Sequence, residues 1–324
     1  MKGIRFWGCV AGVVCAVSAV CAPAAETYPS RPIRLIVPFA PGGGTDIAAR
    51  AVAQKLTQTF GQQVIVDNRP GAGTTIGTDI AAHSAPDGYT LLECSTSLAI
   101  NPSLRRKLPY DALRDFVPIT LVVSEPYVVV THPTFAAKSI KELIALARTK
   151  PGQITFGSPG TGTGGHLAGE LFKLLSGADI THIPYKGNGP ALTDLLGGQI
   201  NLLFATILPA LPHVTSGKLH ALAVSGSQRS SLLPNAPTVA EAGVPGYASG
   251  SWTGVLAPAG TPKDIVAKLN TELVKGLRSP DMREWFAKGG AEPVANTSAE
   301  FAAFIRSETA KWAKVIKAAQ IQAD

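Results

Sequence analysis

Cysteines, aromatic side chains and clustered charges are all scarce in this 324-residue sequence. Of its four cysteines, only Cys94 lies beyond residue 24, which leaves neither a disulfide framework nor a cysteine metal site. We interpret Cys94 as a small buried hydrophobe. Aromatic residues make up 6% of the chain and its basic residues are scattered, so the sequence does not indicate a groove that binds nucleic acid.

The signatures of hydrolytic and metal sites are also missing. No G-x-S-x-G segment occurs, so a serine nucleophile lacks the sharp turn that would expose it. The six histidines show no H-x-x-x-H spacing, and we expect no metal site and no cofactor. The segment from Gly160 to Gly165 fits the G-x-G-x-x-G pattern of dinucleotide folds, but Asp179 precedes the next strand and no acid follows it.

The N-terminus has the pattern of an export signal. Lys2 and Arg5 precede an apolar run from Phe6 to Val20, and Ala22-Pro23-Ala24 supplies small residues at the expected cleavage spacing. We therefore predict a signal peptide over residues 1–24 and a soluble periplasmic or secreted protein. An uncleaved anchor is the alternative, although the run is shorter than the roughly 20 apolar residues of a spanning helix.

The sequence does contain a pair of similar glycine-rich loops. VPFAPGGGTD (37–46) and FGSPGTGTGGH (156–166) each follow an apolar β-type run and each precede a helical pattern. The amides that start such a helix have no partner within it, and the helix dipole adds about half a positive charge there. We predict that two domains grip one anionic ligand between these loops. For either loop alone, an ordinary tight turn is the alternative.

Apolar runs alternate with helical segments, which predicts an α/β fold with mostly parallel sheets flanked by helices. The alternation occurs twice, with crossings expected near Pro126 and Pro245. We expect the three helical segments after Gly246 to pack on the first domain, because nothing else in the sequence after Gly246 could complete a third hydrophobic core with them. The predicted division is domain 1 over residues 25–125 and 246–324, domain 2 over residues 126–245, and a ligand cleft between them.

A few side chains near the loops have distinct expected roles. Asp46 is expected to cap the amides of its own loop rather than meet an anion, and His166 is expected to pack or cap. Lys186 could meet a ligand carboxylate, although a lysine at a strand end is more often solvated. The hydroxyls of residues 95–97 follow a strand of the first domain, where they suit carboxylate oxygens.

A series of longer segments runs in order through the rest of the chain. It includes YPSRPIRLIVPFAPGGGTD, GQQVIVDNRPGAGTTIGT, GTGGHLAGELFK, HIPYKGNGPALTDLLGGQI and PTVAEAGVPGY. This series resembles the tripartite tricarboxylate transporter substrate-binding receptors, also called Bug receptors. The resemblance implies a periplasmic, monomeric, two-domain Venus-flytrap protein without enzymatic activity, which delivers a carboxylate to a membrane permease.

The resemblance also implies that backbone amides and bridging waters of two βα loops hold the ligand. Carried onto this sequence, those loops span Phe39 to Asp46 and Ser158 to His166. Together with the neighbouring strand ends, the candidate ligand-binding residues are Phe39, Ala40, Gly43, Gly44, Asp46, Ser95, Thr96, Ser97, Ser158, Gly160, Thr161, Gly162, Thr163, His166, Tyr185, Ala205 and Thr206.

One position departs from the pattern of the family. Many relatives carry an aspartate after the phenylalanine of the fifth strand of domain 2, whereas this chain has Phe204-Ala205-Thr206. Without that acid, a ligand ammonium group has no partner, so a simple or aromatic carboxylate with two carboxyl groups is expected. A ligand-presenting partner of a membrane sensor kinase, and an exported enzyme that uses the same cleft, stay open as alternatives.

Overall fold

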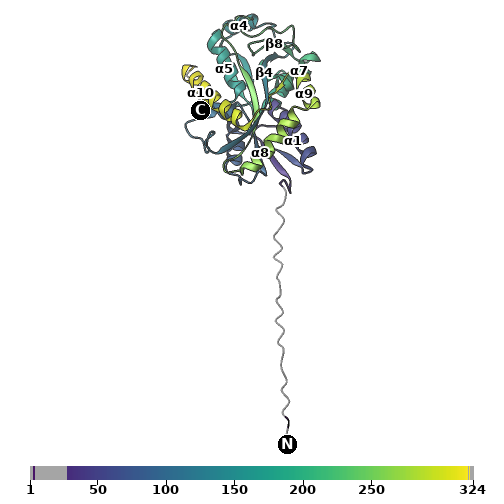
Figure 1. The fold of residues 1–324 in the computed structure, drawn as a ribbon. Helices are drawn as coiled ribbons and strands as arrows, with labels where there is room; N and C mark the ends of the chain where they lie inside the picture. The colour runs from purple at the N-terminus through teal and green to yellow at the C-terminus, as the bar shows by residue number, and fades with distance from the viewer. Residues whose placement is uncertain (1–2, 4–27, 320, 322–324) are drawn as a thin grey trace.

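One ten-stranded sheet runs through the described part of the chain (Figure 1). The computed structural model describes residues 3, 28–319 and 321, so the predicted export signal lies outside them apart from Gly3. The strand order is β2-β1-β3-β9-β4-β7-β5-β6, with β8 and β10 also paired to β4. Within the described ranges, no helix combines the length and the apolar character needed to cross a bilayer.

The first elements alternate as the sequence predicts, and β1 lies between β2 and β3 in parallel register. A nearly continuous apolar run explains β1 as a strand covered on both faces, since Ile33, Leu35, Ile36 and Val37 are all fully buried. One helix that the sequence did not predict, α3, follows directly after β3. The elements are β1 (Ile33–Val37), α1 (Gly44–Phe60), β2 (Val64–Asn68), a 3-10 turn (Ala72–Thr74), α2 (Thr75–Ala82), β3 (Thr90–Ser95) and α3 (Ser97–Leu104).

A single long strand, β4 (Phe116–Thr131), contains Pro126, near which the sequence predicts the first crossing. Residues 116–126 pair with β9, and residues 127–131 pair with β7 and β8, all antiparallel. The first crossing between the two halves of the sheet therefore lies within a continuous strand. Two register shifts against β9 accompany it, at Pro118/Thr120 and Leu121/Val123.

The second half of the sheet repeats the parallel arrangement, with β5 between β6 and β7. Ser139 caps α4 by accepting a hydrogen bond from the Glu142 amide at 3.2 Å, as its sequence predicts. A further helix that the sequence did not predict, α7, follows β7. The elements are α4 (Ile140–Thr149), β5 (Ile154–Ser158), α5 (Gly164–Ser176), β6 (Ile180–Pro184), α6 (Asn188–Leu196), β7 (Leu202–Thr206), α7 (Ile207–Thr215) and β8 (His220–Val224).

The last elements return to the first half of the sheet. Strand β9 pairs with both β3 and β4, and the buried side chains of α10 pack around Trp252. Phe301, Ile305 and Trp312 are all buried there, which confirms the helical spacing seen in the sequence. The elements are β9 (Gly250–Pro258), α8 (Lys263–Leu277), α9 (Pro280–Lys288), β10 (Glu292–Pro293) and α10 (Ser298–Ala319).

The buried residues form separate clusters in two lobes. Two clusters draw almost entirely on residues 33–123 and 252–316, which we call the first lobe, and two on residues 127–247, which we call the second lobe. Figure 1 shows α1 and α8 at the first-lobe end and α4, α5 and β8 at the other. The α/β prediction is confirmed. The domain boundaries stay a prediction, because separate cores do not measure independent movement.

Candidate functional site

A small enclosed cavity lies where the two lobes meet. It measures about 30 Å³, which is room for one or two water molecules, so the lobes are closed on each other in this structure. Its wall is formed by Phe39, Gly43, Gly44, Thr45, Ser95, Thr96, Ser97, Tyr127, Pro159, Thr163, Gly164, Gly165, Asn188, Thr206 and Ser251.

Five helices of the described chain begin at this cavity. Each of α1, α3, α5, α6 and α7 places its N-cap or its first residue on the wall. None of the five has a side-chain cap hydrogen bond, in contrast to α4 with Ser139. Two of their first-turn amides do have side-chain partners other than the N-cap residue, because the Ser97 amide donates to Ser95 Oγ at 3.3 Å and the Leu208 amide to Glu125 Oε2 at 3.1 Å. The five helix dipoles add positive potential at one point.

A larger groove of about 840 Å³ lies on the surface of the second lobe, lined from α4, the end of α7 and residues 229–242. The helix N-terminus that borders it, that of α4, is already capped by Ser139. We therefore place the candidate site at the smaller cavity, where uncapped helix starts converge.

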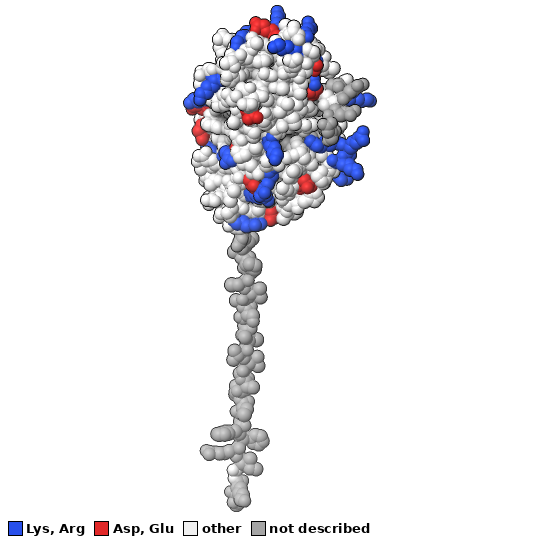
Figure 2. Space-filling view, turned by 180° about the vertical axis from the view of Figure 1, so that it is seen from behind, with Lys and Arg blue, Asp and Glu red and all other residues white. Residues whose placement is uncertain are grey.

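No lysine, arginine, histidine or acidic residue belongs to the wall as far as residues 28–319 describe it. Apart from the buried acids Asp46, Glu93, Glu125 and Glu308, the acidic, lysine and arginine side chains of the described residues are at least partly exposed, and Figure 2 shows basic and acidic groups interspersed on one face. The wall offers hydroxyls and one carboxamide beside the amides. The Thr96 hydroxyl accepts from the Trp252 amide at 3.2 Å and the Thr206 hydroxyl from Asn188 Nδ2 at 3.1 Å, so both keep their own hydrogens for a ligand.

Asp46 holds the first glycine-rich loop in shape from behind the wall. Its Oδ2 accepts from the Gly42 amide and from Arg50 Nε, both at 3.0 Å, and its Oδ1 accepts from Asn68 Nδ2 at 2.8 Å. Burial raises the pKa of Asp46, but these bonds outweigh burial and hold it below its ordinary value. The carboxylate thus uses the Gly42 amide and leaves Gly43 and Gly44 on the wall, in the capping role predicted for it.

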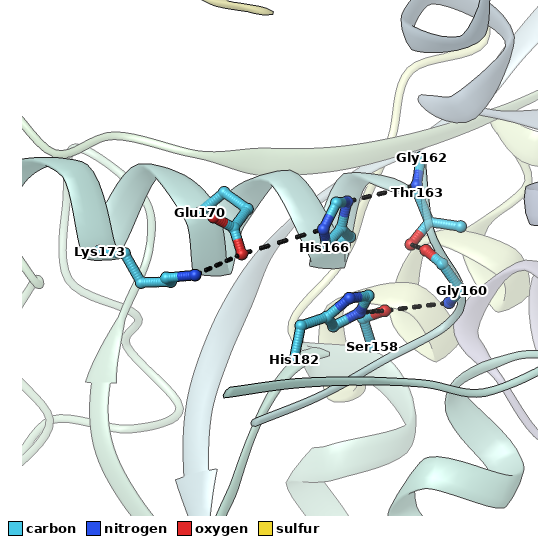
Figure 3. A network of polar contacts seen from close by, with 8 residues as sticks. All are labelled: Ser158, Gly160, Gly162, Thr163, His166, Glu170, Lys173 and His182. Atoms are coloured by element: carbon cyan, nitrogen blue, oxygen red, sulfur yellow. Dashed lines mark hydrogen bonds and ion pairs between the residues drawn. The ribbon is translucent and has the colours of Figure 1, made fainter. Parts of the chain in front are cut away.

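Histidines support the second loop in a comparable way (Figure 3). Ser158 Oγ accepts from the Gly160 amide at 3.1 Å and lies 2.6 Å from His182 Nε2. The Gly162 amide donates to His166 Nδ1 at 3.3 Å. These two amides, which the sequence suggested would meet the anion, are therefore already bonded within the loop. The wall residues of this loop are 163–165, and of these the Thr163 amide also stays within the loop, donating to the Gly160 carbonyl at 3.1 Å.

The two histidine rings lie against each other, with centroids 4.1 Å apart. Burial, helped by the charge of Lys173, lowers the pKa of His166 to about 4. Burial, helped by His166 and Lys173, lowers the pKa of His182 to about 3. Both rings are neutral near pH 7, so His166 can accept at Nδ1 while its Nε2 faces Glu170 at 3.9 Å. His166 acts as a support of the loop backbone, as its position predicted.

Direct bonds join the lobes on both sides of the cavity. The Ala40 amide donates to the Lys186 carbonyl at 2.8 Å, and Arg105 Nη2 donates to the Thr161 carbonyl at 3.0 Å. Residues 39–44 and 186–189, which we call the seam, approach so closely that a Cβ on Gly189 would lie 2.1 Å from the Pro41 oxygen. Glycines at the seam therefore permit a backbone-to-backbone closure.

The structure divides the predicted site residues into two groups. Phe39, Gly43, Gly44, Ser95, Thr96, Ser97, Thr163 and Thr206 lie on the wall. The remainder lie behind it or at its margin, and these are Ala40, Asp46, Ser158, Gly160, Thr161, Gly162, His166, Tyr185 and Ala205. Among this second group, the Tyr185 hydroxyl bonds Asp194 at 2.7 Å and Ala205 is fully buried in the second-lobe core.

Thr45, Pro159, Gly164 and Gly165 lie within the two predicted loops, although they were not singled out there, whereas sequence reasoning missed Tyr127, Asn188 and Ser251. Asn188 carried a usable signal, because Lys186-Gly187-Asn188-Gly189 is a third glycine-rich turn between a strand and a helix. Tyr127 and Ser251 carried none, since each sits in a strand near a crossing between the lobes and only the fold brings them to the cavity.

Comparison with known proteins agrees with this architecture. The sequence profile of the tripartite tricarboxylate transporter family receptors matches residues 48–321. Protein BugT of Bordetella pertussis is 44% identical over 311 residues, which cover 95% of each chain. An R. palustris protein solved with adipate superposes with a TM-score of 0.88 at 36% identity, covering 91% of this chain and 99% of that one. MatC from Rhodopseudomonas palustris, solved with bound malate, superposes with a TM-score of 0.85 at 33% identity, covering 89% and 100%.

Proposed function

Because the chain belongs to the tripartite tricarboxylate transporter family of receptors, we propose that it captures a small organic dicarboxylate in the periplasm and presents it to a membrane permease. The observation that carries this proposal is the meeting of five uncapped helix N-termini at a cavity whose wall holds no charged side chain. Such a wall attracts negative charge without contributing any acid or base of its own.

Two carboxylate groups match the arrangement of donors. The first lobe presents the starts of α1 and α3, and the second lobe those of α5, α6 and α7. The cavity of about 30 Å³ is too small for such a ligand, so the lobes must separate to admit it. A dicarboxylate can then place one group against each lobe and hold them together, with bonds of about 1.5 to 3 kcal/mol for each charged acceptor. Adipate and malate, found with two structural neighbours, are both dicarboxylates and support this class.

The wall argues against amino-acid ligands and against catalysis. The wall itself offers a ligand ammonium group no carboxylate, because Ala205 fills the place of the expected acid and the nearest carboxyl, that of Glu125, lies behind Gly44 and Thr206. Ser95 Oγ donates to Ser97 Oγ at 3.2 Å, and neither hydroxyl has a wall histidine or carboxylate to act as a base. We therefore propose a receptor that releases its ligand unchanged, rather than an exported enzyme.

A thermal-shift screen of residues 25–324 against adipate, malate, citrate, benzoate, phthalate and aspartate tests the proposal. At about 100 times Kd, a ligand should stabilise the protein by roughly 2.7 kcal/mol, and NMR of the mixture should show it unconsumed. Dicarboxylates without an ammonium group should stabilise more than aspartate, which carries one. Stabilisation by none of them, or turnover of the ligand, would overturn the proposal.

A matched pair of variants locates the site. Thr206→Val removes a wall hydroxyl at the start of α7, and we expect a 10- to 100-fold loss of dicarboxylate affinity for one bond to a charged group. Thr215→Val at the end of the same helix removes a hydroxyl that donates to the Leu211 carbonyl at 3.0 Å, far from the wall, and should leave affinity unchanged. Calorimetry on both variants would contradict the placement if Thr206→Val bound as tightly as Thr215→Val.

A further inference from the structure

A buried carboxyl group stands directly behind the wall. Glu125 occupies β4 one residue before Pro126 and is 3% exposed. Its Oε2 accepts from the Leu208 amide at 3.1 Å, in the first turn of α7. Its Oε1 has no hydrogen-bond partner in the described part of the chain. A buried acceptor without a partner is costly in its charged form, so this oxygen needs an explanation.

Two residues of the wall are all that separate this oxygen from the cavity. A Cβ built on Gly44 would lie 2.7 Å from Glu125 Oε1 and 2.6 Å from Thr206 Oγ1, and both Gly44 and Thr206 belong to the wall. Ser251, which pairs with Glu125 across the β4–β9 ladder, is also a wall residue. A negative charge on Glu125 therefore faces any anion in the cavity at short range through a desolvated interior.

No cation among the described residues neutralises the group. On α1, Asp46 faces away and is bonded to Arg50, while the first turn of α7 and the facing part of β9 carry no titratable side chain. On β4, Tyr127 is the titratable neighbour, and burial raises its pKa so that it stays neutral. Burial raises the pKa of Glu125 itself to about 7, with the Leu208 amide opposing. Near neutral pH the group is therefore divided between its two forms.

We infer that Glu125 is a proton-binding site coupled to the ligand site, so that capture of a dicarboxylate is accompanied by uptake of a proton onto Glu125 Oε1. This inference rests on the proposed function. The proton comes from the acid form of the buffer, the new bond is Oε1–H, and the carboxyl becomes neutral. The incoming anion favours the neutral form, so the Glu125 pKa is higher in the complex than in the free receptor.

The direction of the pH effect follows from this order of pKa values. Below about pH 6 Glu125 is protonated with or without ligand, so it contributes no pH dependence to the affinity. Above pH 7 the free receptor has lost the proton that the complex retains, so affinity falls as pH rises, by up to tenfold per pH unit.

Glu93 on β3 supplies a matched control. It is fully buried, and neither of its oxygens has a partner among residues 28–319. Burial raises its pKa to about 8, so it stays mostly protonated at pH 7 in either state. It is not a wall residue, and no wall glycine approaches it as Gly44 approaches Glu125.

Calorimetry with adipate and with malate, in phosphate and in Tris at pH 7.5, counts the protons taken up on binding. We expect between half a proton and one proton per ligand in the parent protein and in Glu93→Gln, and none in Glu125→Gln, whose affinity should be flat from pH 6.5 to 9. Absence of proton uptake in the parent, or its persistence in Glu125→Gln, overturns the inference while leaving a functioning receptor. Failure of both probes to bind the parent at any pH overturns the proposed function, and the inference with it.

Discussion

Closure of the seam can be tested with one methyl group. Gly189 is the second residue of α6, and an added Cβ would lie 2.1 Å from the Pro41 oxygen of the other lobe. Real Cβ atoms essentially never come within 3.0 Å of such an atom, so Gly189→Ala must force the two loops roughly 1 Å apart. The neighbouring bond from the Ala40 amide to the Lys186 carbonyl, now 2.8 Å, would lengthen with it.

Such an opening withdraws one lobe from the ligand. Losing two hydrogen bonds to charged groups costs roughly 3 kcal/mol or more, which corresponds to at least a 100-fold weaker Kd. Gly197→Ala, directly after the same helix, is the control, because its nearest atom is the Thr193 oxygen at 3.5 Å and its φ is −81°. Both changes replace glycine by alanine at an end of α6, so their effects on helix propensity, about 1 kcal/mol at most, are comparable.

Calorimetry with the dicarboxylate found by the screen measures affinity, and small-angle scattering measures closure. The parent and Gly197→Ala should become more compact with ligand through a hinge near Pro126 and Pro245, whereas Gly189→Ala should keep the same profile with and without it. Equal affinities for the two variants would show that the seam need not close for binding, and would refute the two-sided grip.

Three further predictions concern buried and margin groups. The pKa of Glu93 is about 8 in the folded protein against 4.5 ordinarily, so between these pH values the folded protein holds a proton that the unfolded chain has released. The free energy of unfolding should therefore fall by roughly 5 kcal/mol as pH rises through that interval. Urea titrations at pH 5 and pH 9 measure this fall, and Glu93→Gln should abolish much of it. The pKa values of His166 and His182 in the folded protein lie below the ordinary 6.5, so as pH falls the unfolded chain takes up protons before the folded protein does. The free energy of unfolding should therefore drop as pH falls from 6.5 toward 4. In thermal melts over this pH range, His182→Asn should reduce the dependence of the melting temperature on pH. Lys186 is not a wall residue, so Lys186→Met should change the Kd for a dicarboxylate, measured by calorimetry, less than about threefold. Loss of binding in this variant would mean that a charged side chain, rather than backbone amides and hydroxyls, holds the ligand.

The glycine-rich loops could be placed from the sequence because their signals are local. An apolar run, a glycine cluster and a helical pattern occur within about ten residues, and the first loop lies at the cavity as predicted. The second predicted loop, Ser158 to His166, also reaches the cavity, but through Pro159 and residues 163–165 rather than through Gly160 and Gly162. The reason is that the side chains of Ser158 and His166 bond the earlier amides, and no local pattern announces a bond between a side chain and a backbone four residues away.

Helices α3 and α7 were missed for a different reason. Each is short and contains proline, with Pro102 in α3 and Pro209 and Pro212 in α7, which lowers helix propensity. Tertiary packing overrides that preference, because Leu98, Ile100 and the first five residues of α7 are buried. Strand partners such as Tyr127 and Ser251 depend on sheet pairing between distant segments, which a single sequence does not encode locally.

A binding wall made of helix starts also constrains how this receptor can diverge. Amides belong to the backbone, and no substitution other than proline deletes one, so a gene copy that accumulates mutations keeps these donors even where a changed side chain weakens binding. The few wall side chains, such as Ser95, Asn188 and Ser251, can change freely by comparison, and they set the length and shape of the molecule that fits. Many anion preferences can therefore arise from one scaffold by a handful of mutations, without a period in which binding is lost.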